Sequence, residues 1–472
     1  MAIEGLTSRA RKTTVPLVAV SEDGFEKWLS GQPARIKTWA RASGFKARPG
    51  AISLLAAPDG ALERVFLGLP SPTAKAPGTE EGALWAYAAC PFGLPEGSYR
   101  LDRRVGAAHA GEAALGWALG SYRFTRYRKP DRAPARLVWP PNAGRPGVEN
   151  AALATFLVRD LINTPAGDMG PSHLAAAARR LGRQFGARVS VITGARLLDR
   201  NYPAIHAVGR AAADPPRLID LHWRPAGRRR APMVVLCGKG VCFDTGGLDL
   251  KSTAGIKLMK KDMGGAAQAL GLARMIMAAG LPIRLRVLIP AVENAVAGNA
   301  YHPLDVISTR LGLSVEVGNT DAEGRIVLAD ALAEACRARP DLLIDMATLT
   351  GAARVALGTD LPALFCNDDG LAEKTLAAGR RAEDPLWRLP LWAPYRDKLD
   401  SRVADINNIS PGAYGGAITA ALFLQEFVTN GTPWIHVDFM GWNETERPGR
   451  PEGGEAQGMR ALFALIEKEF CA

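Results

Sequence analysis

Two segments of the chain concentrate the residues that could do chemistry. The first covers residues 234–268, VVLCGKGVCFDTGGLDLKSTAGIKLMKKDMGGAAQ, and places Lys239 and Asp244 just after an apolar run typical of a buried strand. The second covers residues 316–332, EVGNTDAEGRIVLADAL, and contains several acidic and polar residues. In α/β proteins, ligands gather where strands end, so both segments are candidates for a site.

The second segment can bring two carboxylates together. If the strand that ends at Gly318 stays extended through Glu323, the alternation of side chains places Asp321 and Glu323 on the same side. Two like charges close together raise a pKa or demand a counter-ion. Arg325 and the two lysines of the first segment could supply that charge, and so could metal ions.

Four carboxylates follow strands or precede helices in these segments: Asp244, Asp262, Asp321 and Glu323. Such an oxygen-rich set suits Mn²⁺, Mg²⁺ or Zn²⁺. A single aspartate more commonly caps a helix or pairs with a neighbouring lysine. The spacing alone leaves both interpretations open.

Other catalytic patterns are missing. The first segment lacks GxxxxGK[ST], and GxGxxG fails because Phe243 occupies the third glycine position, so a nucleotide-binding loop is disfavoured. The six histidines are scattered and form no HExxH. Neither GxSxG nor a recognisable partner for Cys237 or Cys242 is present, which argues against a covalent nucleophile.

The elements around the two segments predict a sheet covered by helices. From about Pro171, helical patterns alternate with short β-rich runs, as in a mostly parallel sheet. The pattern predicts helices over 175–185, 263–279, 324–337 and 418–427, and strands over 189–192, 232–237, 284–289, 315–318, 342–346 and 435–439.

The chain divides at a proline-rich, basic stretch over residues 128–147. We expect a small basic α/β N-terminal domain over 1–145, which includes a helix over 107–119, then a linker helix within 146–170. A catalytic domain follows over 171–472. The predicted fold class is thus α/β, with a central mixed, mostly parallel sheet in the larger domain.

Composition sets further bounds. The 472 residues are 47% apolar and 22% charged, which fits two or more globular domains and excludes disordered and fibrous classes. Residues 1–150 carry 21 basic and 13 acidic residues, or +8 of the net +11, so nucleic acid is kept as a secondary partner. The six cysteines form no CxxC, and no segment approaches the roughly twenty apolar residues of a membrane span. We expect a cytoplasmic protein without a membrane partner.

Together, the two segments resemble the leucyl aminopeptidase family of two-metal peptidases, the cytosol aminopeptidases of family M17. The family hallmark NTDAEGR stands intact at residues 319–325, and GKG…FD[ST]GG…K…DMGG is matched over 238–265. RDLINTPAGDMGPSHLA, ATLTGAARVALG and GGAITAALFLQEF also look like family segments, so the resemblance spans roughly residues 115–440. Beyond about Phe439, the chain follows the family pattern only loosely.

The resemblance implies two divalent ions per subunit, Mn²⁺ or Zn²⁺. One would be held by Lys239, Asp244, Asp262 and Glu323, and the other by Asp244, Asp321 and Glu323. Lys239 would ligate as a neutral amine, which requires a large downward shift of its pKa. A water bridging the two ions would become the nucleophile, and the free α-amine of the substrate would complete the coordination of one ion.

The resemblance also implies the remaining roles. Lys251 would stabilise the oxyanion, and Arg325, with backbone groups near Leu349, would bind a bicarbonate ion that carries the proton to the leaving amine. The side-chain pocket would be lined by four residues, Met259, Asn319, Thr348 and Gly351. The expected activity is that of a leucyl aminopeptidase, which releases apolar N-terminal residues such as leucine from peptides with a free α-amine.

The last property that the resemblance implies is the oligomeric state. Family members are usually homohexamers, and the resemblance implies the same here. The alternative from a different class is a basic DNA-binding or scaffold protein that keeps the peptidase shell; its binding would survive loss of the metal site and weaken steeply with salt.

Overall fold

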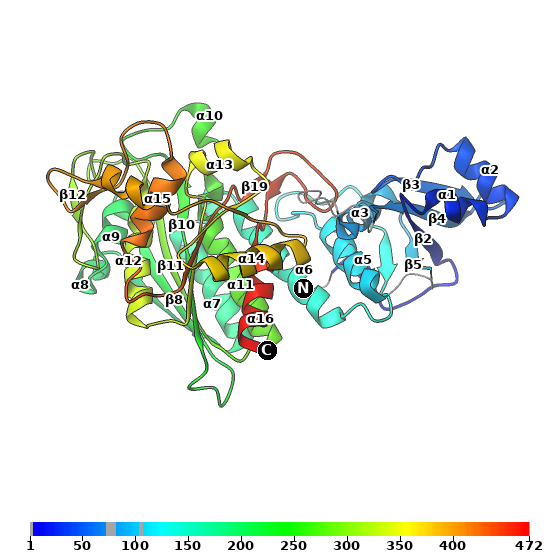
Figure 1. Cartoon of the computed structure of the whole chain (residues 1–472), viewed down its shortest axis with the longest axis horizontal. Helices are drawn as coiled ribbons and strands as arrows, with labels where there is room; N and C mark the ends of the chain where they lie inside the picture. Colours follow the sequence, from blue (N-terminus) through cyan, green and yellow to red (C-terminus); the bar gives the residue numbers. More distant parts are fainter. Residues whose placement is uncertain (1–2, 72–81, 103–106, 472) are drawn as a thin grey trace. The chain divides into compact units, whose positions relative to one another are not determined.

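The computed structural model describes residues 3–71, 82–102 and 107–471. Two compact units emerge, one formed by residues 1–156 with 445–452 and the other by residues 157–444 with 453–472. Both combine helices with a mixed, mostly parallel sheet, as Figure 1 shows. The predicted fold class is confirmed.

The first unit is built on a six-stranded sheet with the order β1-β6-β5-β2-β4-β3. Adjacent strands are parallel except for β3 and β4, which are antiparallel. The strands are β1 (Leu6–Thr7), β2 (Val15–Ser21), β3 (Ile52–Ala56), β4 (Leu62–Leu69), β5 (Ser98–Leu101) and β6 (Arg136–Val138). The helices are α1 (Phe25–Ser30), α2 (Ala34–Ala42), α3 (Ala83–Ala88), α4 (Cys90–Gly93) and α5 (Ala107–Gly120).

Strand β4 shows why this sheet is covered on both faces. Its side chains alternate, so Val65 and Leu67 join one apolar cluster while Phe66 joins another. The first cluster contains Trp117 of α5, whose indole N–H donates to the carbonyl of Ala135 at 2.7 Å. Burial of both faces explains the short apolar runs of the N-terminal sequence.

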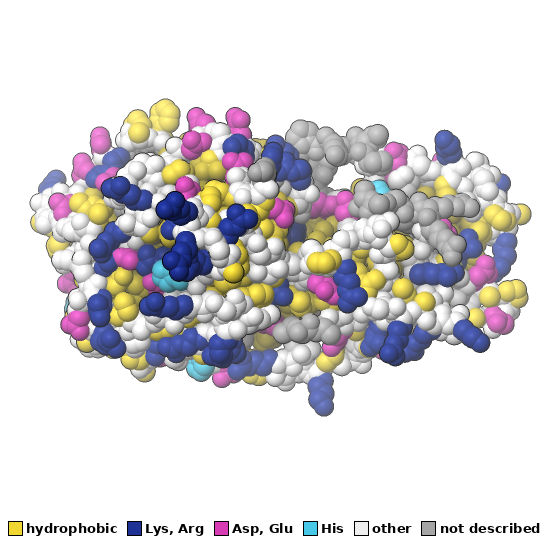
Figure 2. Space-filling model, turned by 90° about the horizontal axis from the view of Figure 1, so that it is seen from below, with side chains coloured by type: hydrophobic (Ala, Val, Ile, Leu, Met, Phe, Trp, Pro, Cys, Tyr) yellow, Lys and Arg dark blue, Asp and Glu magenta, His cyan; other side chains and the backbone are white. Residues whose placement is uncertain are grey.

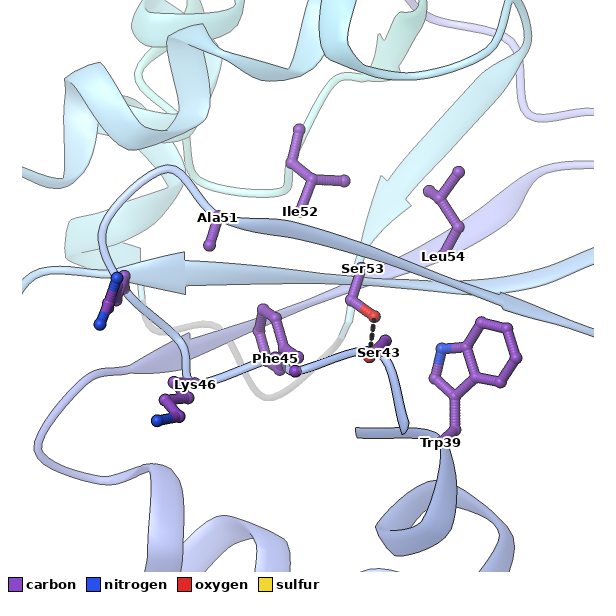
Figure 3. Close-up of a pocket in the computed structure, with 10 residues that line it drawn as sticks. Trp39, Ser43, Phe45, Lys46, Ala51, Ile52, Ser53 and Leu54 are labelled. Carbon is purple, nitrogen blue, oxygen red and sulfur yellow. Dashed lines mark hydrogen bonds between the residues drawn. The ribbon is translucent and has the colours of Figure 1, made fainter. Parts of the chain in front are cut away.

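A pocket of about 630 Å³ lies beside β3, the edge strand of this sheet. Figure 3 shows its lining, in which Ser43 and Ser53 lie 3.2 Å apart in a hydrogen bond and Trp39, Phe45 and Lys46 lie around them. None of its lining residues belongs to the two chemistry-bearing segments, which lie in the second unit.

The second unit is built on a nine-stranded sheet with the order β16-β15-β18-β14-β9-β11-β8-β7, and β10 pairs with β11. The five inner strands β10, β11, β9, β14 and β18 run parallel, whereas β8 is antiparallel to β11 and β7, and β15 to β18. These strands are β7 (Arg188–Thr193), β8 (Arg217–Trp223), β9 (Met233–Gly238), β10 (Gly240–Asp244), β11 (Arg284–Asn294), β14 (Leu342–Ala347), β15 (Ala363–Cys366), β16 (Trp387–Arg388) and β18 (Trp434–Asp438). Two small sheets contain β12 (Val306–Ser308), β13 (Ser314–Glu316) and β17 (Ile406–Asn407), and β19 (Trp442–Asn443) and β20 (Gly453–Gly454).

Helices cover this sheet on both faces (Figure 1). On one face, the core packs α9, α12 and α15 against Val235 and Cys237 of β9. The helices of the unit are α7 (Pro171–Phe185), α8 (Arg196–Asp199), α9 (Pro203–Gly209), α10 (Thr253–Ile256), α11 (Gly264–Ala279), α12 (Glu323–Arg337), α13 (Gly351–Leu357), α14 (Asp369–Arg381), α15 (Gly416–Gln425) and α16 (Met459–Cys471). Short 3₁₀ helices are η1 (Ala166–Asp168), η2 (Met259–Met263) and η3 (Ala393–Leu399), and α6 (Arg145–Asn163) begins in the first unit and ends in the second.

The predicted helices and strands of the larger unit are confirmed, but the geometry expected before α12 is wrong. Strand β13 ends at Glu316, and the chain then turns, so Asp321 lies in a turn and Glu323 is the first residue of α12. The Asn319 side chain accepts a hydrogen bond from the Asp321 amide at 2.6 Å, which stabilises the turn instead of an extended chain. Alternation along a strand therefore does not place these two carboxylates.

Charge is spread over the surface. Figure 2 shows Lys and Arg side chains scattered across the face that it draws, with acidic and apolar side chains between them. Nucleic acid as a partner stays a prediction, as do the domain boundaries expected from the sequence. Within residues 3–71, 82–102 and 107–471, no helix is both long and apolar enough to span a bilayer.

Candidate metal centre

The predicted metal ligands come from different elements that meet at one edge of the larger sheet. Lys239 connects β9 to β10, Asp244 ends β10, Asp262 lies in η2 and Glu323 begins α12. Each of the four is at most 3% exposed. Because β9 and β10 both run parallel to β11, the chain delivers Lys239 and Asp244 to the same edge.

Three of the four predicted carboxylates converge directly. Asp244, Asp262 and Glu323 each offer an oxygen within 4.8 Å of the other two. Lys239 lies among them, with its Nζ 2.7 Å from Asp262 Oδ2 and 2.8 Å from Glu323 Oε1. The lysine therefore lies inside the acid cluster, where a ligand would lie.

Two buried oxygens of this cluster lack a hydrogen bond. Asp262 Oδ2 and Glu323 Oε1 lie near Lys239 Nζ, but no donor meets either oxygen in hydrogen-bonding geometry. The Lys239 ammonium instead donates to the carbonyl of Thr348 at 3.1 Å. Buried acceptors nearly always have a partner, and hard oxygen donors with one amine suit a divalent cation. The residues present therefore fit a metal centre.

The fourth carboxylate, Asp321, is connected to the acid cluster through Lys251. The Lys251 Nζ lies 2.8 Å from Asp244 Oδ2 and also pairs with Asp321 Oδ1. The Asp321 side chain is 35% exposed, so the site opens toward solvent on this side. The fold thus brings the predicted metal ligands and the predicted catalytic lysine, Lys251, together at one place.

The electrostatics of the cluster favour additional positive charge. Burial and the charge of Asp244 raise the pKa of Glu323 to about 8, and the same two causes raise the pKa of Asp321 to about 6. Lys239 and Lys251 offset only part of each shift. Four acids against two lysines leave more negative charge than the protein neutralises, so a bound dication would stabilise the ionised form of both carboxylates.

Lys239 itself is held as a cation by the protein groups. Burial favours its neutral form, but Asp262 and Glu323 outweigh burial and raise its pKa above the usual range. The neutral amine implied by the resemblance therefore requires the charge of a bound metal ion.

Two glycines of the motifs lie so close to neighbouring atoms that a side chain would not fit. A Cβ at Gly324 would lie 2.7 Å from Lys239 Nζ, and one at Gly265 would lie 2.0 Å from the carbonyl oxygen of Met346. Gly324 makes room for the lysine, and Gly265 lets the start of α11 pack on β14. These glycines position the site and do not form a phosphate-binding loop.

Arg325 is buried beside the cluster on α12, at 8% exposure. Its Nη1 donates to the carbonyl of Asn408 at 2.6 Å, while its Nε is buried without an acceptor. Burial lowers its pKa to about 10, so it remains a cation at neutral pH. A free donor on a buried guanidinium fits a small anion. Backbone groups near Leu349 were predicted to help Arg325 bind bicarbonate. The Leu349 amide instead donates to Asp438 Oδ1 at 2.9 Å.

The four predicted pocket residues lie on different elements. Met259 begins η2, Asn319 lies in the turn before α12, Thr348 follows β14, and Gly351 begins α13. Thr348 Oγ1 donates to Asp262 Oδ1 at 2.6 Å, which ties the end of β14 to the acid cluster. Asn319 instead supports the Asp321 turn. Their contact with a substrate stays a prediction.

Sequence reasoning missed Asn294. This residue ends β11 and is fully buried, and its Nδ2 donates to Asp244 Oδ1 at 2.8 Å and to the carbonyl of Thr320 at 3.1 Å. It therefore orients one acid of the cluster and fixes the turn that carries Asp321. The available signal was an asparagine at the end of a long apolar strand next to the one that carries Lys239.

Comparison with known protein families and their members supports this site. The catalytic-domain model of the cytosol aminopeptidase family matches residues 156–463, and the M17 aminopeptidase N-terminal domain matches residues 15–140. A probable cytosol aminopeptidase of Nitratidesulfovibrio vulgaris is 41% identical over 377 residues, which cover 76% of this chain and 74% of the relative. A Peptidase B of an Enterobacter species is 41% identical over 391 residues, which cover 80% of this chain and 91% of that protein.

Solved structures agree as well. The cytosol aminopeptidase of Coxiella burnetii superposes with a TM-score of 0.91 at 48% identity, covering 99% of this chain and 100% of that one. The bottromycin maturation enzyme BotP, solved in complex with Mn, superposes with a TM-score of 0.86 at 36% identity, covering 97% of this chain and 99% of that one.

Fold, buried acid cluster and relatives together define an aminopeptidase of the metallopeptidase class. The chain belongs to the cytosol aminopeptidase family, M17, with both its N-terminal and its catalytic domain. The resemblance inferred from the sequence motifs is confirmed.

Proposed function

We propose that this chain is a two-metal aminopeptidase that removes one residue at a time from peptides with a free α-amine. The observation that supports the proposal best is the buried cluster of Asp244, Asp262 and Glu323 around Lys239, in which two carboxylate oxygens form ion pairs with the lysine but accept no hydrogen bond. Asp321, tethered through Lys251, would complete the ligand set. The BotP complex with Mn supports a divalent ion in this fold.

When bound, two divalent ions supply Lewis acidity, which polarises a scissile carbonyl and lowers the pKa of water. Lys239, Asp244, Asp262, Asp321 and Glu323 are the residues that would hold them. Asn294 and Thr348 orient Asp244 and Asp262 through hydrogen bonds of 2.8 Å and 2.6 Å. Such supporting partners keep ligand oxygens aimed inward.

Lys251 is the residue that would stabilise the oxyanion. Burial favours its neutral form, but Asp244 and a hydrogen bond to Asp321 outweigh burial and raise its pKa above the usual range. It is therefore protonated at neutral pH. A fixed cation at the mouth of the acid cluster can stabilise negative charge that develops on the substrate oxygen.

Arg325 is proposed to hold bicarbonate. Its unpaired Nε and its burial support an anion at this place. The Leu349 amide already donates to Asp438, so the guanidinium is the donor that the geometry supports. A bound bicarbonate would supply a nearby proton acceptor.

The remaining expectations are proposals as well. Mn²⁺ or Zn²⁺ as the metal, a homohexameric assembly and a cytoplasmic location follow from the family. So does a preference for apolar residues such as leucine. The domain boundaries at 145 and 170 are kept as a proposal for truncation design.

The test is to strip the protein of metal, restore one ion at a time and measure release of leucine from unblocked and N-acetylated leucyl amides. We expect hydrolysis to require added metal and to be confined to the unblocked amide. Cleavage of the acetylated amide at a similar rate would contradict a requirement for the free α-amine. Full activity in the metal-free protein would contradict the metal centre.

A further inference from the structure

The pocket beside β3 in the first unit has no part in the proposed reaction. β3 is the last strand of the six-stranded sheet, and within the described residues no strand pairs with its outer edge. The pocket, of about 630 Å³, is lined by residues of β3 and by residues of the segment 39–48. An exposed strand edge offers peptide groups to which an extended chain can add, so this pocket is a candidate docking site.

The outer edge of β3 presents the peptide groups of Ile52 and Leu54. The amide of Gly68 donates to the carbonyl of Ala51 at 2.9 Å, which fixes the hydrogen-bonding pattern between β3 and β4. In an antiparallel pair, hydrogen-bonded and non-hydrogen-bonded residue pairs alternate, so Ile52 and Leu54 fall in the non-hydrogen-bonded pairs. Their N–H and C=O groups therefore point away from β4, to the side where a further strand would lie.

The two faces of this edge differ in chemistry. Side chains alternate along β3, so Ile52 and Leu54 lie on one face and Ser53 lies on the other, as Figure 3 shows. Ile52 and Leu54 are partly buried and pack against the apolar cluster that contains α5. Ser53 forms a hydrogen bond with Ser43, and Trp39 packs on the same face. A strand added here would thus meet an apolar face on one side and a polar face on the other.

The polar face contains a donor that lacks an acceptor. The indole N–H of Trp39 is buried and makes no hydrogen bond with the described residues. Figure 3 shows its nitrogen on the side of the ring that is turned toward Ser43 and Ser53. Buried donors nearly always have a partner, so this indole calls for an acceptor that arrives with a ligand. A carboxylate has acceptor atoms only and suits an indole N–H beside two hydroxyls.

The segment that lines the polar face is basic. Residues 34–48 include no acidic residue, and their basic residues are Arg35, Lys37, Arg41, Lys46 and Arg48. Arg35 pairs with Glu63 at 2.8 Å, whereas the other four form no ion pair with the described residues. Lys46 and Arg48 are exposed and line the pocket itself. Positive charge of this kind favours an acidic partner over a neutral or basic one.

We propose that the pocket beside β3 binds an extended acidic segment of a partner protein, which adds to the sheet as a further strand. The backbone of that segment would pair with the peptide groups of Ile52 and Leu54. Its alternate side chains would lie on opposite faces, apolar ones against Ile52 and Leu54 and acidic ones beside Trp39 and the basic segment. The favoured sequence therefore alternates acidic and apolar residues. This binding does not depend on the proposed aminopeptidase function.

The test measures, by calorimetry, the binding of the blocked peptide acetyl-Glu-Val-Glu-Val-Glu-Val-amide to the metal-loaded full chain. We expect one peptide per chain, bound at least about tenfold more tightly than the same peptide with lysine in place of glutamate. In Lys46→Glu/Arg48→Glu, the affinity for the glutamate peptide should fall by about tenfold. Arg9→Glu/Lys12→Glu makes the same change of charge at exposed residues after β1, on the opposite edge of the sheet, and should keep the wild-type affinity.

Two further peptides test the addition of a strand. One has N-methyl groups on all its valines and the other on all its glutamates, so each lacks every second N–H. A chain that adds to β3 turns only alternate N–H groups toward it. One methylated peptide should therefore bind about tenfold more weakly than the parent, and the other should bind about as tightly as the parent.

The remaining outcomes contradict the proposal. Equal affinity for the glutamate and lysine peptides, or an unchanged affinity in Lys46→Glu/Arg48→Glu, would place the binding elsewhere, the metal centre included. Two methylated peptides that both bind like the parent would exclude strand addition. Duplex DNA that binds in place of the peptide and is lost in the same variant would assign the basic segment to nucleic acid. An oligomer that dissociates in this variant, with no peptide bound by the wild type, would assign the edge to a second copy of the chain.

Discussion

Two buried lysines, Lys239 in the acid cluster and Lys261 in η2, differ in the groups that surround them. In the cluster, Lys239 is enclosed by carboxylates, and two of their oxygens form ion pairs with it but accept no hydrogen bond. Lys261 is equally buried, but its ammonium forms neither an ion pair nor a hydrogen bond with the described residues. Burial alone therefore does not assign a role to a lysine. In the cluster, the excess of carboxylates over lysines favours bound cations.

The largest effect is expected from Lys251→Met, which probes the cluster. If Lys251 stabilises the oxyanion and is not a ligand, its loss should lower kcat by about 10²–10³ while both ions stay bound. Metal content by elemental analysis provides the control, and loss of bound metal in this variant would make Lys251 part of the metal centre.

A second effect follows from the pKa values of the cluster. Glu323 has a pKa raised to about 8 and Asp321 to about 6, so at pH 6 Glu323 is protonated and Asp321 is about half protonated. Because ligands must be ionised, the affinity for Mn²⁺ should fall as the pH is lowered from 8 to 6, by up to about tenfold per unit for each proton displaced. Titration calorimetry at three pH values measures this slope. An affinity independent of pH would contradict the assignment of these carboxylates as ligands.

Asn294→Ala tests the residue that sequence reasoning missed. Loss of its hydrogen bonds to Asp244 and to the Thr320 carbonyl should weaken metal binding by about 10- to 100-fold, as for other outer partners of metal ligands. Asn299→Ala, an exposed asparagine after the same strand, is the matched control. An unchanged metal affinity in the Asn294 variant would show that Asp244 does not depend on this support.

Much of this account could be predicted from the sequence, for reasons that differ between elements. The strands β9, β11 and β14 were predicted because both faces of a central parallel strand are buried and its sequence is mostly apolar. The residues of NTDAEGR and DMGG were found because glycine and carboxylate at fixed spacing are visible without coordinates. Their three-dimensional arrangement was not predicted correctly, since Glu323 reaches the cluster from the start of α12 and not along a strand.

Two features were missed in the sequence. Asn294 follows an unremarkable apolar run, and only the pairing of β11 with β10 brings it to Asp244. Lys261 stands between two other charged residues, where a lysine is usually solvated; its burial depends on the packing of η2 against β10. Both depend on contacts between distant segments, which local patterns do not encode.

The central claim is that the buried acid cluster binds two divalent ions, and anomalous diffraction from crystals grown with manganese tests it most directly. The account predicts two anomalous peaks per subunit among Asp244, Asp262, Asp321 and Glu323, with the Lys239 amine beside one of them. Crystals that showed no anomalous peak there, with Lys239 still bridging Asp262 and Glu323, would contradict it.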